Sequence, residues 1–274
     1  MLDWSSDPFH NRTVLTLAGD APGVTAALLA VYEVAAATID IRRHHGVHPR
    51  VGAVDVVPLV PLAGISSGAC VALARALGRL VAERFGVPVF LYEDAATRPE
   101  RRALENIRRG QLAGLTRRMN QPQWRPDFGP RTPHPAAGVS VIGARSILIA
   151  FNVNLATDDL TVAREIARTV RASGGGLPHV KAIGVQLGGG RVQVAMNLTN
   201  YCQTPLQRAF DAVRLEAARR GVAVAGSELV GLIPADALDA AGAHHLQLED
   251  FGPERLLETH LGGPLATPGA PWES

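Results

Sequence analysis

Short runs of β-branched and aromatic residues alternate along the chain with longer segments rich in alanine and leucine. The short runs predict strands, and apolar residues at helical spacing predict helices. This alternation is typical of an α/β protein. The expected helices cover 22–43, 66–85, 99–109, 158–172, 205–220 and 236–244, and the expected strands cover 13–17, 51–57, 87–92, 146–152, 180–187, 192–198 and 222–229.

The second half is the more regular part of this pattern. Its predicted order is strand, helix, strand, strand, helix, strand, which indicates a ferredoxin-like split βαβ unit. Proline, glycine and polar residues dominate 121–138, where we expect a long ordered loop. Loops of this length in compact proteins usually take part in function. The predicted organisation is therefore a first subdomain over 1–120, a connecting loop over 121–142, a second subdomain over 143–245 and a tail over 246–274, which we expect to be frayed after Gly262.

Composition narrows the class of protein. Apolar residues make up 47% and charged residues 19% of the 274 residues, which is typical of a globular protein. A net charge of +2 and 5% aromatic residues argue against nucleic-acid binding. We expect no signal peptide and no apolar stretch long enough for a membrane span, and we expect Cys70 and Cys202 to be reduced thiols. These features predict a cytoplasmic protein.

A basic run lies between the predicted helix at 99–109 and the loop. We favour its interpretation as a solvated helix face. The alternative is that its positive charge attracts an anionic ligand toward the protein. The run consists of Arg98, Arg101, Arg102, Arg108, Arg109, Arg117 and Arg118.

The segment 42–55 is the most informative for chemistry. Pro49 disfavours a helical conformation at His48, so His48 lies on a connection between a helix and a strand. An imidazole suits proton transfer at neutral pH, but composition alone favours a solvated helix end rich in cations as the explanation of these residues. His44 and His48 have a zinc-ligand spacing, but Gly46 and Pro49 break the helix that such a site needs, and we expect no metal.

Several motifs in one order resemble the formiminotransferase family. The central one is His-x-Gly-x-His-Pro-Arg-x-Gly-x-x-Asp-Val at 44–56, and the similarity extends in register from about residue 2 to 238. The others are Asn11-Arg12-Thr13, Val87-Pro88-Val89-Phe90-Leu91-Tyr92, Pro126-Asp127-Phe128-Gly129-Pro130, Gly143-Ala144-Arg145, Ala150-Phe151-Asn152-Val153-Asn154, and Gly226-Ser227-Glu228-Leu229-Val230-Gly231-Leu232-Ile233-Pro234.

The resemblance implies two ferredoxin-like α/β subdomains facing each other across a substrate channel, in a homodimer. It implies transfer of a formimino group from N-formimino-L-glutamate to N5 of tetrahydrofolate, the co-substrate. The catalytic residue falls on His48, which would act as base and then as acid. The folate-contacting loop falls on Gly129, Pro130, Arg131, Thr132, Pro133, His134, Pro135, Ala136, Ala137 and Gly138, of which only the two ends match the family well. Further candidates for substrate binding are Asn11, Arg12, Arg50, Asp55, Arg145 and Asn152.

The three arginines and Asp55 among these candidates are also supported by their chemistry. Arginine guanidinium groups are suited to bidentate binding of the carboxylates that both substrates carry. Asp55 lies on the strand after His48 and either orients the imidazole or caps a turn.

The resemblance is incomplete at the start of the chain. The family's first strand and helix, with a Val-Pro-Asn-Phe-Ser-Glu-Gly motif, have no counterpart here, and removing a central strand would leave unpaired backbone on both neighbours. Of three explanations, we favour a start codon assigned too late over a truncated homologue or another element that fills the gap. We expect any cyclodeaminase activity on a separate polypeptide. The alternatives for function are a relative that processes 5-formyltetrahydrofolate and a catalytically weak folate-binding protein.

Overall fold

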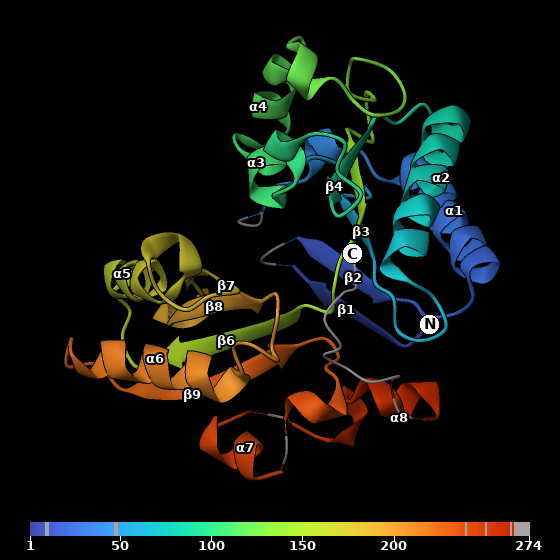
Figure 1. Ribbon diagram of the computed structural model, residues 1–274. Helices are drawn as coiled ribbons and strands as arrows, with labels where there is room; N and C mark the ends of the chain where they lie inside the picture. The colour runs from blue at the N-terminus through green and yellow to red at the C-terminus, as the bar shows by residue number, and fades with distance from the viewer. Residues whose placement is uncertain (9–10, 47–48, 239, 250, 264, 266–274) are drawn as a thin grey trace. The chain divides into compact units, whose positions relative to one another are not determined.

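The computed structural model describes residues 1–8, 11–46, 49–238, 240–249, 251–263 and 265 of the chain. It divides into two compact units, residues 1–145 and 146–274 (Figure 1). The mixture of helices with parallel and antiparallel sheets confirms the predicted α/β class. Residues 121–142, expected to connect two halves, lie within unit 1.

Unit 2 contains a four-stranded antiparallel sheet and two long helices. The sheet order is β7-β8-β6-β9, so the first and third strands of the unit are neighbours, as a split βαβ arrangement requires. The elements are β6 (Ile149–Leu155), α5 (Leu160–Val170), β7 (Val180–Gln186), β8 (Val192–Leu198), α6 (Leu206–Ala218) and β9 (Val224–Val230), followed by short helices α7 (Ala240–His245) and α8 (Leu257–Leu261).

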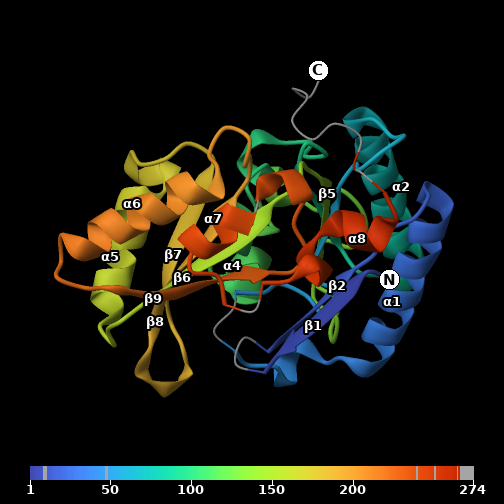
Figure 2. The same cartoon turned by 90° about the horizontal axis from the view of Figure 1, so that it is seen from below.

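One face of this sheet forms the core of unit 2. Successive side chains of a strand point to opposite faces, so Phe151 and Val153 of β6 face the core, as Val194 of β8 does. They pack against α5 and α6, which lie side by side in Figure 2. The alternate residues of the same strands, including Asn152, lie on the opposite face.

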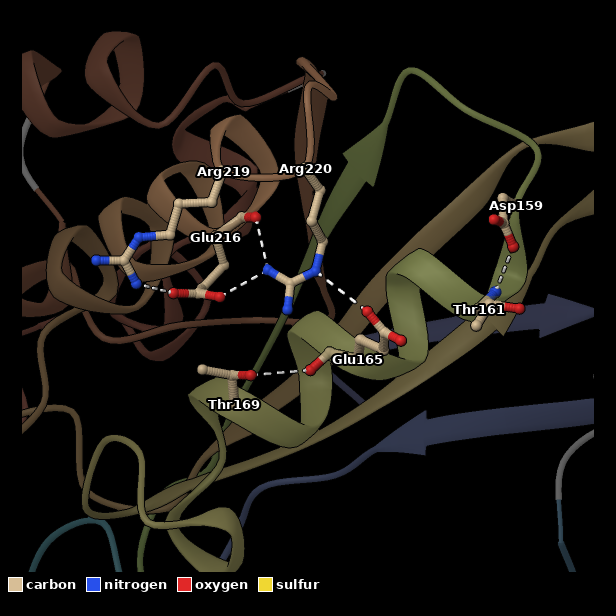
Figure 3. A network of polar contacts seen from close by, with 7 residues as sticks. All are labelled: Asp159, Thr161, Glu165, Thr169, Glu216, Arg219 and Arg220. Atoms are coloured by element: carbon tan, nitrogen blue, oxygen red, sulfur yellow. Dashed lines mark hydrogen bonds and ion pairs between the residues drawn. The ribbon is translucent and has the colours of Figure 1, made fainter.

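A polar network joins the two helices of unit 2 (Figure 3). Arg220 donates to Glu216 of α6 at 2.6 Å and to Glu165 of α5 at 3.4 Å. At the beginning of α5, the side chain of Asp159 accepts a hydrogen bond from the Thr161 amide at 2.8 Å. The cap satisfies one of the free amides of the first turn, and the arginine links the end of α6 to the middle of α5.

Unit 1 contains two separate sheets. Strands β1 (Asp3–Asp7) and β2 (Arg12–Thr16) form an antiparallel ribbon, and a three-stranded parallel sheet has the order β3-β5-β4. The remaining elements are α1 (Ala21–Thr38), β3 (Val56–Leu59), α2 (Ser67–Phe85), β4 (Val89–Glu93), α3 (Leu104–Arg108), α4 (Gln111–Arg118) and β5 (Ser140–Ala144). A second continuous ferredoxin-like sheet was expected here, but no described strand joins β2 to β3.

The parallel sheet of unit 1 is buried on both faces. Leu91 of β4 faces α1 and α2, whereas Phe90 of the same strand faces α3 and α4, and Figure 1 shows the two helix pairs on opposite sides of β4. Burial on both faces explains why its strands are continuous apolar runs. Strand β5 was missed because the run 139–142 directly follows the proline-rich loop.

Two predictions about unit 1 were wrong: a single helix over 99–109, and the absence of any stretch long and apolar enough to span a membrane. The helix expected over 99–109 is a 3₁₀ turn at Pro99–Arg101 followed by the five-residue α3, because Ala103 adopts an extended conformation between them. Helix α1, with 11% of its residues buried, is long and apolar enough by length and composition to cross a membrane. The helices of soluble proteins also pass that test, so it assigns no membrane location. Tyr32 of α1 is buried and stacks on Phe85 of α2.

Candidate functional site

The segment that precedes β3 carries the candidate catalytic histidine. His48 itself lies outside the described residues, and the structure describes its neighbourhood through residues 44–46 and 49–55. Asn11, at the start of β2 with a positive φ of 48°, contacts the histidine segment from the ribbon. Its side-chain amide donates to the His45 carbonyl oxygen at 2.9 Å and lies 3.3 Å from Nδ1 of His44. Two motifs separated by more than thirty residues therefore meet here.

Asp55 closes the turn that follows His48. Its Oδ1 accepts hydrogen bonds from the Val51 amide at 2.7 Å and the Gly52 amide at 3.2 Å, and its Oδ2 forms an ion pair with Arg108. Of the two roles considered for Asp55, turn capping is the one that the described contacts display. The cap fixes the backbone immediately after Pro49.

Arg12 adds a second cation near Asp55. Burial lowers the pKa of Arg12, whereas the charge of Asp7 raises it, that of Arg108 lowers it and that of Asp55 raises it. Arg12 and Arg108 thus lie near two carboxylates, those of Asp7 and Asp55, in unit 1.

The remaining candidate arginines lie farther along the chain. Arg50 follows Pro49 and is half-buried. Arg145 comes directly after β5, and its amide donates to the Leu59 carbonyl oxygen at 3.0 Å. Burial raises the pKa of Tyr92, and a hydrogen bond with Arg145 partly offsets that rise.

The loop 129–138 returns to the histidine segment at its end. The Ala53 amide donates to the Ala137 carbonyl oxygen at 2.9 Å, and Gly52 forms an isolated bridge with Gly138. Gly138 has a φ of +71°, and a Cβ there would lie 2.5 Å from the Val51 carbonyl oxygen, so only glycine fits. His134 accepts the Ala137 amide at 3.0 Å through Nδ1 and holds the loop end in a tight turn.

A buried ion pair anchors the beginning of the same loop. Arg101 and Asp127, with side chains 1% and 7% exposed, approach to 2.8 Å. Asp127 also accepts the Leu91 amide at 2.8 Å, which attaches the loop to β4. These contacts place Gly129 directly after a rigid support.

The same contacts revise the interpretation of the basic run as a solvated face. Arg101 is buried, Arg108 pairs with Asp55, and Arg118 stacks over Trp124 at 4.1 Å while donating to backbone carbonyls. Only the other four arginines of the run are exposed. Sequence spacing could not separate the two groups, because their partners lie on distant segments.

Asn152 belongs to unit 2, on the sheet face opposite the core. Its side-chain amide donates to Glu228 of β9 at 3.0 Å. Gln193 of β8 donates to the same carboxylate oxygen at 2.8 Å and to Asn154 at 2.9 Å. Sequence reasoning proposed Asn152 and missed its three partners as site residues, although Asn154 and Glu228 lie in motifs that it had identified.

Metal binding has no support in the part of the chain that the structure describes. No group of three or more histidine, cysteine, aspartate or glutamate side chains there could hold an ion. The candidate chemistry of these residues is proton transfer and carboxylate binding.

Comparison with known proteins gives matches along most of the chain. The family model "Formiminotransferase domain, N-terminal subdomain" matches residues 1–145, and "Formiminotransferase domain" matches 150–253. The glutamate formimidoyltransferase of Streptococcus pyogenes is 45% identical over 265 residues, which cover 96% of this chain and 89% of that protein. That of Thermoplasma acidophilum is 46% identical over 264 residues, which cover 95% and 87%. The rat formimidoyltransferase-cyclodeaminase is 39% identical, and its match covers 96% of this chain but 51% of the rat protein.

Proposed function

The chain belongs to the formiminotransferase family, and on that premise we propose that it is an enzyme that transfers the formimino group of N-formimino-L-glutamate to N5 of tetrahydrofolate. The products are 5-formiminotetrahydrofolate and glutamate, in a step of histidine degradation. Relatives at 45–46% identity over nearly the whole chain bear the name of this activity.

The observation that carries the proposal is the convergence of three elements on the residues that flank His48. Asn11 holds the segment before it, Asp55 caps the turn after it, and the end of the loop 129–138 pairs with Gly52. A catalytic side chain needs such support on both sides, because small displacements reduce the rate strongly. These contacts hold the described residues on both sides of His48, and they support its assignment as the catalytic residue.

The proposed reaction needs one group that first accepts and then donates a proton. The N5 lone pair attacks the formimino carbon and gives a tetrahedral intermediate, while N5 loses its proton to the imidazole of His48. The bond from that carbon to the glutamate nitrogen then breaks, and His48 returns the proton to the departing nitrogen. An imidazole suits both steps because its ordinary pKa lies near neutrality.

The substrate carboxylates require cations, and unit 1 offers several. Arg12 of β2 lies near Asp55, Arg50 follows Pro49, and Arg145 follows β5. We assign folate contact to the loop Gly129–Gly138, whose two ends are fixed to the framework of unit 1 by Asp127 and by the bridge at Gly52. Tetrahydrofolate enters as a co-substrate.

The surroundings of the enzyme follow from its relatives. We infer a cytoplasmic homodimer that acts on small molecules. The rat relative bears the name formimidoyltransferase-cyclodeaminase, and its match with this chain covers about half of its length. We therefore infer that a cyclodeaminase activity uses the product.

The test is a transferase assay with N-formiminoglutamate and tetrahydrofolate on the wild type, His48→Ala and the matched control His45→Ala. We expect His48→Ala to lose about 10²- to 10⁴-fold in kcat, the usual effect of a lost acid–base group. The exposed His45 side chain has no assigned role, so its variant should retain activity.

Two outcomes would favour the alternatives. Turnover of 5-formyltetrahydrofolate, without transfer from N-formiminoglutamate, would indicate a relative of different specificity. Folate binding by a folded wild type without any turnover would indicate a binding protein. Equal losses in both histidine variants would refute the assignment of His48.

A further inference from the structure

The face of the unit 2 sheet opposite its core carries a connected group of polar side chains. Asn152 and Asn154 of β6 lie beside Gln193 of β8 and Glu228 of β9, and we call these four residues the sheet-face cluster. In the register, Asn152 is opposite Glu228, and Asn154 is opposite Gln193. The four side chains therefore share one face of three adjacent strands.

Two of the three hydrogen bonds within this cluster end on one carboxylate oxygen. Asn152 Nδ2 and Gln193 Nε2 both donate to Oε1 of Glu228, at 3.0 and 2.8 Å. Gln193 uses its second N–H on Asn154 at 2.9 Å, and these two side chains are only 3% and 4% exposed. The amides thus fix the position of the carboxylate.

The carboxylate nevertheless retains unused hydrogen-bonding capacity. An ionised carboxylate accepts about four hydrogen bonds, whereas Oε2 of Glu228 has no partner among the described residues. None of the described arginine, lysine or histidine side chains forms an ion pair with it. A half-buried carboxylate held by two neutral amides is costly unless a further donor completes it.

Small residues lie beside part of the cluster. Ala195 of β8 is opposite Asn152 on the side away from Glu228, and Ala150 precedes the cluster on the same face of β6. Gly226 of β9 is opposite Asn154, and a Cβ there would lie 2.2 Å from a carboxylate oxygen of Glu249. Small side chains therefore border the cluster on β6 and β8, and a second carboxylate lies close to it at Gly226.

We propose that Glu228, positioned by Asn152 and Gln193, binds a planar N–C–N group that carries an N–H on each nitrogen. Such a group meets a carboxylate through two parallel hydrogen bonds, as a guanidinium does. Both substrates of the proposed reaction contain one: the formimino group of the donor, and the N3–H with the 2-amino group of the pterin ring. This inference rests on the proposed function and extends it to a binding residue in unit 2.

The test compares Glu228→Gln, Glu228→Met and the control Asn197→Ala, whose exposed side chain lies on the same face of β8 outside the cluster. Glutamine retains one acceptor oxygen, whereas methionine removes both. For each variant we would measure KM for N-formiminoglutamate, kcat, and the Kd of 5-formyltetrahydrofolate by fluorescence titration. Melting curves by circular dichroism establish that each variant is folded.

We expect Glu228→Met to weaken one ligand about 100-fold and Glu228→Gln about tenfold, with the control unchanged. A raised KM for the donor with an unchanged folate Kd would identify the formimino group. A raised folate Kd would identify the pterin. A purely structural role would lower the melting temperature without this split between ligands.

Each remaining outcome is decisive. If the wild type is active and both folded Glu228 variants stay within about threefold of the control, the cluster binds neither substrate and the inference fails alone. If methionine prevents folding, the glutamine variant decides by the same criterion. If the wild type neither turns over nor binds folate, the proposed function fails first, and the inference fails with it.

Discussion

Replacing Arg101 with methionine would test how the beginning of the loop 129–138 is held in place. The change removes the cation of a pair whose side chains are 1% and 7% exposed, while keeping most of the apolar volume. It also removes hydrogen bonds to the Arg125 carbonyl oxygen at 2.7 Å and to the Thr97 hydroxyl at 2.6 Å. Asp127 would keep its bonds from the Leu91 amide and Thr97, but its charge would be buried without a cation.

The magnitude follows from that unpaired charge. Breaking a buried ion pair by removing one partner costs about 3–5 kcal/mol. We expect the lower end, about 3 kcal/mol, because Nε of Arg101 is itself buried without a hydrogen-bond partner and already reduces the benefit of the pair. For a unit of this size that corresponds to a melting temperature lower by roughly 6–12 °C.

The assay is thermal unfolding followed by circular dichroism, with two controls. Arg102→Met removes the neighbouring arginine, which is 68% exposed in its pair with Asp94, and should change stability by less than about 0.5 kcal/mol. The double variant Arg101→Met with Asp127→Asn removes both charges and should recover much of the loss. A loss below about 1 kcal/mol in the single variant, or no recovery in the double one, would refute the reasoning.

Three further predictions concern the site and unit 2. Gly138→Ala should lower the free energy of unfolding by about 1–3 kcal/mol and raise the KM for tetrahydrofolate, because its Cβ would lie 2.5 Å from the Val51 carbonyl oxygen. An unchanged, wild-type KM would contradict this. Asn11→Gly, which keeps the positive φ, should lower kcat about tenfold with little change in melting temperature, as steady-state kinetics would show. The hydrogen bond from Arg220 lowers the pKa of Glu216 below its ordinary 4.5, so this stabilisation is present above pH 4.5 and lost as pH falls through the lowered pKa. Glu216→Gln should therefore lower the free energy of unfolding by about 1 kcal/mol at pH 7. Unfolding curves at several pH values should show this difference from the wild type becoming smaller in acid. A difference that does not depend on pH would exclude the carboxylate as its cause.

Local sequence patterns were sufficient for unit 2. Strand β8 was predicted with its observed limits, 192–198, and the helices α5 and α6 to within about two residues at each end. Apolar residues there alternate strictly because one face of the sheet packs on two helices. The order of elements then allowed few topologies, and the split βαβ arrangement was one of them.

The same patterns were less informative for unit 1. Strand β5 is central in the parallel sheet and buried on both faces, so its sequence has no alternation to distinguish it from the loop that precedes it. The helix expected over 99–109 is interrupted at the extended Ala103, and Arg101 in the turn before it pairs with Asp127, a contact between residues 26 positions apart. No local pattern contains that information.

The sequence by itself determined the α/β class, the split βαβ order of unit 2 and, through its motifs, the family. Periodicity and ordered motifs are properties of neighbouring residues, and a linear reading preserves them. Only the tertiary structure decided which side chains meet: Asn11 with the histidine segment, Arg108 with Asp55, and Glu228 with two amides from other strands. Those contacts join segments far apart in the chain, and they form because folding brings together polar groups that would be costly to bury alone.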